Sequence, residues 1–428
     1  MHDLAIIGAG WAGYNAAIKA KELGLKVCLI ENSQVGGTCL NLGCIPTKTL
    51  IQSAKIFSLV KKSASFGVET QGPKINLAKV QERKDKVVQL LRSGMQAKLK
   101  DIDLLTGAAG IISPDKIKVG SQSIETKNIL IATGSRPFEL AQLKFDSKKI
   151  ISSNEALNLK AVPARLLIVG GGVIGCEFAS LYSTLGSQVT IAEKMPQLLP
   201  GIDSEVAKKI EVIFKKKKIA VSTNTDASSF KQSDFDLILV CVGRLPNTES
   251  LNLQNIGLKT DKNKVVVDEY LRTSIPNIFA AGDCTGKLML AHYAAYQGVI
   301  AAENIANPQT MKKADNAVVP SCIFSDPEIA SVGVNEEEAK NKGIEVSVKK
   351  FDFLASGMAR IIDEAEGFIK TVCEAKTGRL IGASIIGPKA TELISIFGLA
   401  ISNDLTAEQI KHTIFAHPSL SESIRESL

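Results

Sequence analysis

The sequence has no long hydrophobic run. No apolar stretch approaches the roughly 20 residues that a membrane-spanning helix needs, so the sequence predicts no membrane partner. Aromatic residues make up only 5% of the chain, which argues against a surface that stacks nucleic-acid bases. The net charge of +7 is modest for 428 residues, and the basic run 215–218 is typical of a solvated helix end. We therefore expect no nucleic-acid partner either.

A targeting segment is also missing from the sequence. A predicted strand begins by Leu4, which leaves no room for a signal or transit peptide, so we expect a cytoplasmic protein. The content of 45% hydrophobic and 22% charged residues is ordinary for globular proteins. A chain of 428 residues is too long for a single core and predicts two to four domains.

Most cysteines are scattered along the chain. Cys28 and Cys241 lie in apolar strand-like runs and Cys176 at a predicted helix start, which is typical of reduced core thiols rather than of a secreted disulfide framework. Cys39 and Cys44 differ, because they lie close together in a glycine-rich segment. Two such thiols can alternate between disulfide and dithiol and so store two electrons. A structural disulfide, half a metal site and unrelated core thiols are the alternatives.

Two segments repeat one pattern of strand, glycine turn, helix, second strand and glutamate. The glycines and acids of the two copies are Gly8, Gly10, Gly13 and Glu31, and Gly170, Gly172, Gly175 and Glu193. The first glycine permits a tight turn, the second lets the backbone approach a pyrophosphate, and the third allows close helix–strand packing, while the acid binds ribose hydroxyls. Glycine turns in unrelated α/β units are the alternative, but the identical spacing from glycine to acid favours two dinucleotide-binding units.

The predicted fold class is α/β, with two Rossmann-like dinucleotide-binding domains and a C-terminal α+β domain for dimerisation. The sequence assigns residues 1–142 to the first nucleotide domain and 143–263 to the second. Residues 264–313 return to the first domain, since they contain a strand that runs into a glycine turn with an acid. Residues 314–428 have no nucleotide fingerprint and are assigned to association.

In this order, these pieces resemble the flavin-dependent pyridine nucleotide–disulfide oxidoreductases, and within that family the enzymes that act on lipoamide. The resemblance covers nearly the whole chain. It rests on GAGWAGY at 8–14, GGTCLNLGCIPTK at 36–48, ATGSRP at 132–137, GGGVIGCE at 170–177, VGRLPNT at 242–248, AAGDC at 280–284 and HPSLSE at 417–422. Trp11 and Ala12 depart from it, because they replace the proline and glycine usual in the first fingerprint.

The resemblance implies FAD and NAD as cofactors, and no metal. The implied cofactor-binding residues are Gly8, Gly10, Gly13, Glu31, Gly37, Thr38, Lys48, Ala109, Thr133, Gly134, Asp283 and Ala291, together with Gly170, Gly172, Gly175, Glu193, Val221 and Gly243. A carboxylate at Glu193 pairs with a free ribose 2′-hydroxyl and repels a 2′-phosphate, so NAD is favoured over NADP.

A base is also needed, because a thiolate rather than a thiol attacks a disulfide. His417 is the best candidate, and Glu422 would accept the other ring N–H and fix the tautomer. A helix-start turn is the alternative explanation for this His-Pro dipeptide.

The resemblance further implies that Cys39 faces the substrate, that Cys44 faces the flavin, and that Lys48 paired with Glu177 stabilises negative charge on the reduced ring. It also implies a homodimer in which His417 completes the partner's cysteine site.

The expected reaction is the oxidation of protein-bound dihydrolipoamide to lipoamide with NAD⁺. The expected partners are the lipoyl-bearing components of 2-oxo acid dehydrogenase or glycine cleavage complexes. A related NAD(P)H-dependent disulfide reductase acting on a small thiol, and a non-catalytic redox sensor or scaffold of the same fold, are the alternatives.

Overall fold

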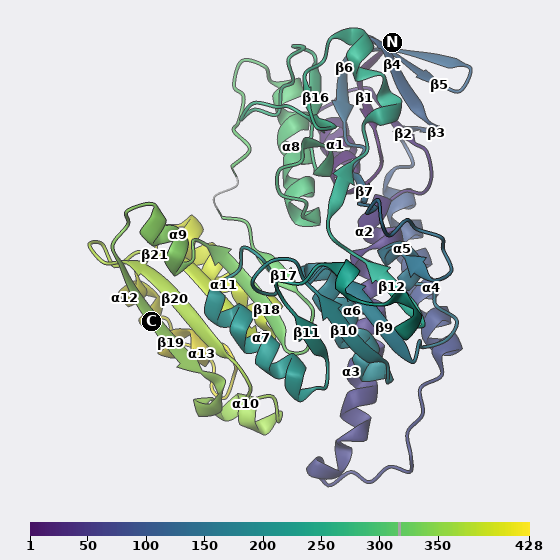
Figure 1. Ribbon diagram of the computed structural model, residues 1–428. Coiled ribbons are helices and arrows are strands. Elements are labelled where there is room, and N and C mark those ends of the chain that lie inside the picture. Colours follow the sequence, from purple (N-terminus) through teal and green to yellow (C-terminus); the bar gives the residue numbers. More distant parts are fainter. Residues whose placement is uncertain (316–317) are drawn as a thin grey trace.

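The computed structural model describes residues 1–315 and 318–428. Figure 1 shows two α/β units and a C-terminal sheet that lies beside the second of them. This arrangement confirms the predicted fold class of two nucleotide-binding units followed by an α+β domain. Within the described ranges no helix is both long and apolar enough to cross a membrane.

The first unit is built on a mostly parallel sheet with helices on one face. Its elements are β1 (His2–Ile7), α1 (Trp11–Glu22), β2 (Val27–Glu31), β3 (Asp103–Thr106), β4 (Ala109–Ser113), β5 (Lys116–Val119), β6 (Gln122–Ile131), β16 (Ile278–Ala280) and α8 (Ala291–Ala306). The strand order is β3-β2-β1-β6-β5-β4, and β16 also pairs with β6. The run Leu4–Ile7 of β1 is buried, as expected for a central parallel strand covered on both faces. Helices α1 and α8 pack on one face of the sheet.

A helical excursion leaves this sheet after β2. It consists of α2 (Gly37–Leu42), α3 (Cys44–Lys61) and α4 (Leu77–Lys98). The side chain of Asn76 begins α4 by accepting a hydrogen bond from the Lys79 backbone N–H (3.1 Å). Helices α3 and α4 pack against each other, and α3 also packs against the second unit.

The second unit repeats the βαβ arrangement around a parallel sheet. Its elements are β8 (Ile150–Ile151), α5 (Ser153–Ala156), β9 (Arg165–Val169), α6 (Val173–Leu185), β10 (Gln188–Ala192), α7 (Ser204–Lys216), β11 (Ala220–Ser222) and β12 (Leu237–Val240). The strand order is β11-β10-β9-β12-β8. The lysines at 215–218 are exposed at the end of α7, which confirms that this basic run is a solvated helix end.

After β12 the chain returns to the first unit through β13 (Arg244–Pro246), which pairs with β7 (Ser135–Pro137). The hairpin of β14 (Thr260–Asp261) and β15 (Lys264–Val265) follows. Apolar side chains at 251, 253 and 258 share a core with β4 and β5 of the first unit. From the sequence we had assigned residues up to 263 to the second unit, but the packing puts this stretch with the first. The domain bounds themselves stay predictions.

The C-terminal unit is an antiparallel sheet with helices. Its elements are β17 (Ser321–Ile323), β18 (Glu328–Gly333), α9 (Glu336–Asn341), β19 (Val346–Asp352), α10 (Gly357–Ile361), β20 (Phe368–Glu374), β21 (Leu380–Gly387), α11 (Ala390–Ser402), α12 (Ala407–Lys411) and α13 (Glu422–Glu426). The strand order is β17-β18-β21-β20-β19, and α11 packs on β18 and β21. One hydrophobic core runs from α3 through the second unit into this sheet, so the units share buried apolar area.

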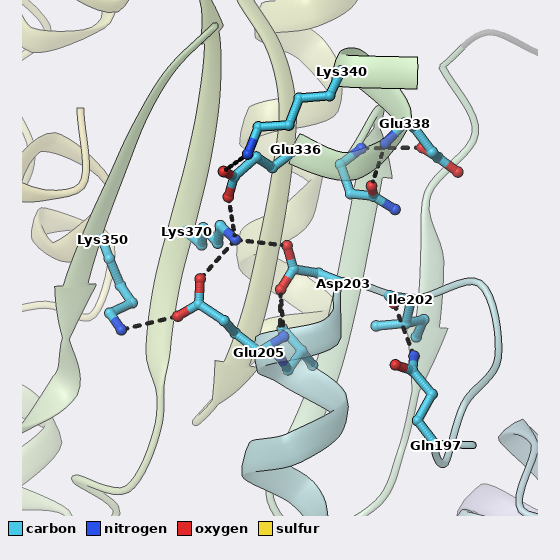
Figure 2. A network of polar contacts seen from close by, with 11 residues as sticks. Gln197, Ile202, Asp203, Glu205, Glu336, Glu338, Lys340, Lys350 and Lys370 are labelled. Atoms are coloured by element: carbon cyan, nitrogen blue, oxygen red, sulfur yellow. Dashed lines mark hydrogen bonds and ion pairs between the residues drawn. The ribbon is translucent and has the colours of Figure 1, made fainter. Parts of the chain in front are cut away.

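A buried lysine joins the second unit to the C-terminal sheet. Lys370 on β20 is 4% exposed, and its Nζ contacts Asp203 (2.9 Å), Glu205 (2.7 Å) and Glu336 (3.0 Å), as Figure 2 shows. Burial alone would lower the pKa of Lys370, but its hydrogen bonds to the three carboxylates outweigh burial and raise that pKa. Asp203 also caps α7 by accepting a hydrogen bond from the Glu205 backbone N–H (2.9 Å). This cluster fixes α7 against the C-terminal sheet.

Lys370→Ala is expected to lower the free energy of unfolding by about 3–5 kcal/mol, because it removes the ammonium that three carboxylates share and leaves the buried Asp203 without its ion-pair partner. Lys350→Ala is the matched control: Lys350 pairs with the same Glu205 but its side chain is 42% exposed, so a loss under about 1 kcal/mol is expected. Denaturant unfolding at one protein concentration measures both, and equal effects would contradict the assigned role.

The Lys370 hydrogen bond lowers the pKa of Glu205. The stability that this ion pair contributes is therefore present at neutral pH and is lost as the pH falls through the lowered pKa of Glu205.

Candidate functional site

The first and third glycines of both nucleotide turns are so tightly packed that no side chain fits. A Cβ on Gly13 would lie 1.8 Å from the Gly8 carbonyl oxygen, and one on Gly175 would lie 1.9 Å from that of Gly170. Gly8 and Gly170 also share nearly the same positive φ, 105° and 107°. The two turns therefore have the same geometry, in agreement with the sequence repeat.

The acid at the end of each second strand folds back onto its turn. Glu31 accepts hydrogen bonds from the backbone N–H groups of Ala9 (2.7 Å) and Ser33 (2.8 Å). Glu193 accepts them in the same way from Gly171 (2.6 Å) and Met195 (2.7 Å). Each carboxylate is thus fixed at the edge of a glycine turn, where a ribose of a bound dinucleotide would lie.

The turns also suit a pyrophosphate. Helices α1 and α6 begin at Gly10 and Gly172 without a capping side chain and without an acid in the first turn, so their free N–H groups remain available for an anion. Beside the first turn, Thr133 Oγ1 is buried and has no hydrogen-bond partner among the described residues. Such an orphaned hydroxyl is costly unless a ligand satisfies it, so the residues fit a bound dinucleotide.

A contact between two glycines brings the cysteine helix to the first turn. A Cβ on Gly37 would lie 2.7 Å from the Gly10 Cα, and Gly37 has a φ of 56°. Gly37 begins α2, so Thr38 and Cys39 follow directly against the nucleotide turn. Cys44 begins α3 immediately afterwards. The backbone thus positions both thiols beside the place where the cofactor would lie.

The two thiols are electrostatically unequal. Both are free thiols and partly buried. The hydrogen bond from Cys39 and the nearby Lys48 ammonium outweigh burial and lower the pKa of Cys44 to about 7, while the same hydrogen bond and burial raise the pKa of Cys39. Cys44 is therefore the sulfur that carries negative charge near neutral pH, which is consistent with the asymmetry expected from the sequence.

Lys48 lies one helical turn after Cys44 and is held by a buried acid from the second unit. Its Nζ donates to both carboxylate oxygens of Glu177, each at 2.8 Å, and Glu177 is 3% exposed. Glu177 Oε1 also accepts the backbone N–H of Phe324 (2.9 Å), and the Phe324 ring lies 4.8 Å from Lys48 Nζ. The predicted pair therefore exists, and it joins α3, α6 and the segment after β17.

His417 and Glu422 form the second predicted pair. His417 Nδ1 lies 2.8 Å from Glu422 Oε1, and Glu422 also accepts the Ser419 backbone N–H (2.9 Å). That backbone bond, and next the bond with His417, lower the pKa of Glu422, so the carboxylate stays charged and orients the imidazole. The His417 side chain is 81% exposed, which leaves Nε2 open to another molecule.

The two groups of predicted catalytic residues do not meet within one chain. Cys39, Cys44, Lys48 and Glu177 lie together around α2 and α3, whereas the His417–Glu422 pair lies at α13 in the C-terminal unit. Figure 1 shows α12, α13 and the C-terminus on the opposite side of the molecule from α2. Within one chain, the predicted catalytic residues therefore form two separate groups.

The remaining predicted cofactor residues flank the two turns. Ala109 begins β4, Ala291 begins α8 and Val221 lies in β11, beside Ile191 of β10. Thr133 and Gly134 follow β6, Asp283 follows β16 and Gly243 follows β12, so all of these lie at carboxyl ends of parallel strands, where ligands of such sheets bind.

Sequence reasoning did not assign a role to Ser135 or Arg244. Ser135 donates to Asp283 (2.5 Å), and Arg244 Nε donates to Ser135 Oγ (2.7 Å). This network orients Asp283, one of the predicted cofactor residues. Both residues belong to the quoted motifs ATGSRP and VGRLPNT, so the signal was present, but only the fold shows that they meet.

Known proteins are similar to this chain over almost its whole length. Residues 2–298 match the family described as pyridine nucleotide-disulphide oxidoreductase, and residues 319–428 match its dimerisation domain. A dihydrolipoyl dehydrogenase of Geobacillus stearothermophilus is 41% identical over 450 residues, covering 99% of this chain and 95% of the relative. A dihydrolipoyl dehydrogenase of Chlamydia pneumoniae is 40% identical over 439 residues, covering 98% of this chain and 95% of the relative.

Solved structures share the fold over almost the whole length. LpdA from Mycobacterium tuberculosis has a TM-score of 0.92 at 29% identity and covers 99% of this chain and 98% of its own. The HOCl-induced flavoprotein disulfide reductase RclA from Escherichia coli has a TM-score of 0.89 at 30% identity, covering 99% of both chains. The chain therefore belongs to the pyridine nucleotide-disulphide oxidoreductase family.

Proposed function

We propose that this protein is a homodimeric dihydrolipoyl dehydrogenase that oxidises protein-bound dihydrolipoamide to lipoamide with NAD⁺. Full-length relatives of that name at about 40% identity support this function, and the family uses FAD and NAD. The observation that carries the proposal is the polarised pair Cys39–Cys44 beside the first nucleotide turn, with Lys48 and Glu177 behind it. The first glycine turn, Glu31 and Asp283 would hold FAD, which would supply the two-electron redox chemistry that links the dithiol to NAD⁺.

The chain's own residues perform the thiol chemistry. His417 of a second copy, oriented through Nδ1 by Glu422, accepts a substrate thiol proton at Nε2. The substrate thiolate then attacks Cys39 Sγ, the Cys39–Cys44 bond breaks, and Cys44 leaves as a thiolate. The second substrate thiol attacks the first substrate sulfur, and its proton passes to Cys39 while the first proton stays on His417. Cys39 then leaves and takes up a proton, so one dithiol becomes one cyclic disulfide and the cysteines become a reduced pair.

The unequal thiols explain which sulfur is attacked. Thiol–disulfide exchange proceeds faster when the leaving thiol has the lower pKa. The lowered pKa of Cys44 makes it the better leaving group, so attack is directed to Cys39. Glu177 holds the Lys48 ammonium in place, and this ammonium favours the thiolate form of Cys44.

The proposed partners are lipoyl-bearing components of 2-oxo acid dehydrogenase or glycine cleavage complexes. The dimerisation-domain match supports the homodimer, and the assigned partners follow from the substrate chemistry. The cytoplasmic location expected from the sequence stays a prediction.

Mixing the purified yellow protein anaerobically with dihydrolipoamide and NAD⁺ is expected to form one NADH per dithiol oxidised. Cys39→Ser should abolish turnover because no sulfur remains to accept the substrate. Absorbance at the NADH band and titration of free thiols measure both products. Turnover of a small disulfide with NADPH, without turnover of dihydrolipoamide, would contradict the proposal and favour the small-thiol reductase.

His417→Ala is expected to lower kcat by about 10²–10⁴-fold, since the general base is removed. His412→Ala is the control: His412 is also an exposed histidine paired with a glutamate, and its loss should leave kcat unchanged.

Co-expressing Cys44→Ser chains with His417→Ala chains should restore about a quarter of the wild-type activity, because half of the dimers are mixed and each mixed dimer has one intact site. No recovery in mixed dimers of confirmed composition would refute a base supplied in trans.

Glu193→Arg is expected to shift the ratio of kcat/KM for NAD⁺ over NADP⁺ by at least about tenfold toward NADP⁺, because an arginine accommodates the 2′-phosphate that the carboxylate repels. Lys194→Ala controls for the neighbouring charge and should change the ratio much less. Steady-state kinetics with both nucleotides measure the effect. An unchanged ratio in a variant that retains its FAD would show that Glu193 does not select the cofactor.

A further inference from the structure

Trp11 is the only tryptophan of the chain, and it occupies a position where related fingerprints usually have proline. It is the first residue of α1, directly after Gly10. The close approach of Gly37 to Gly10 brings α2 against this point, so the indole emerges next to the helix that carries Cys39.

The indole N–H has an unusual environment. Nε1 is buried and finds no partner of normal hydrogen-bond geometry in the described part of the chain. Buried donors of this kind are rare, because an unsatisfied N–H loses its hydration without compensation. A group that becomes a strong acceptor at some stage of the reaction would explain why the donor is kept there.

Cys39 is that acceptor. The indole N–H lies close enough to the Cys39 sulfur to favour its ionised form and so to lower its pKa, against the larger opposing effects of Cys44 and of burial. A neutral thiol is a weak acceptor, whereas a thiolate is a strong one that draws donors into shorter bonds. The contact therefore strengthens when the sulfur becomes charged.

We propose that the Trp11 indole N–H donates a hydrogen bond to the Cys39 sulfur as that sulfur becomes a thiolate, and so promotes its departure from the substrate. This proposal rests on the proposed function. When the second substrate sulfur attacks the first, the bond from substrate sulfur to Cys39 Sγ breaks, and the electron pair moves onto Cys39. Trp11 stabilises this charge until a proton reaches the sulfur.

The charged and titratable groups that act on Cys39 are Cys44 and Lys48 of α3. Cys44 opposes ionisation of Cys39, since two thiolates so close repel each other, whereas Lys48 favours it. A test of Trp11 therefore needs a background without Cys44.

The experiment compares holoenzyme of Cys44→Ser with Cys44→Ser/Trp11→Phe, which keeps an aromatic ring but removes the donor. Iodoacetamide alkylation of Cys39 is followed by mass spectrometry between about pH 6 and 10. Trp11→Phe is expected to slow alkylation at about pH 8 roughly three- to tenfold while leaving the limiting rate at high pH unchanged, because fewer thiolates form but each reacts equally. If the Trp11→Phe variant fails to fold, Trp11→Pro in the same Cys44→Ser background replaces it. Trp11→Pro restores the usual residue, and it should slow the alkylation of Cys39 in the same way. Tyr14→Phe, on the same helix, should change nothing.

Identical alkylation profiles with and without the indole would overturn the proposal. A fall in bound FAD with unchanged alkylation would also overturn it, because the indole would then serve the cofactor. Slower alkylation in the Trp11→Phe variant, together with a wild-type holoenzyme that fails to oxidise dihydrolipoamide, would support the role of Trp11 and refute the proposed function, so the two failures are distinguishable.

Discussion

The site depends on one interaction, the ion pair between the buried carboxylate of Glu177 and Lys48. The carboxylate accepts both hydrogen bonds of Lys48 from the first unit and the Phe324 backbone N–H from the segment after β17, while its own helix belongs to the second unit. A carboxylate that is 3% exposed is costly unless all such partners stay in place. The charge requirement of one side chain therefore fixes three parts of the chain around Cys44. Because Lys48 cannot move without stranding Glu177, the positive charge that polarises the thiol pair is held in a fixed place.

The ion pair positions the thiol side of the site, and a close approach of two backbone segments positions the cofactor side. Gly37 meets Gly10 without room for a Cβ, so the distance between the cysteine helix and the nucleotide turn is set by main-chain atoms alone. Contacts of this kind cannot relax through side-chain rotation, which makes them suitable for holding a redox pair beside a flexible dinucleotide. Lys370 performs a related task further away by fixing α7 against the C-terminal sheet.

The sequence contained the local parts of this design but not the contacts between distant ones. The glycine turns, Glu31 and Glu193 were predictable because their spacing reports a local βαβ geometry that physics allows in few ways. The roles of Ser135 and Arg244, the Lys370 cluster and the position of the Trp11 indole were not predictable. Each depends on how units far apart in sequence pack, and no periodicity reports such packing. The sequence assigns the stretch 251–258 to the second unit for the same reason. Its apolar residues indicate that it is buried, but they do not indicate against which sheet it packs.

The exposure of His417 suits the base in trans that we propose. A base buried in its own chain would need no orientation from outside, but it would meet no substrate bound to another subunit. Here the Ser419 backbone N–H holds Glu422, and Glu422 orients the imidazole within its own chain, so association has only to bring an oriented group into place. Ordering an exposed pair within the single segment 417–422 costs little, because the two residues are close in sequence and Glu422 begins α13. In the proposed dimer, the thiol pair of one chain would meet an imidazole pair that is already formed within the other chain.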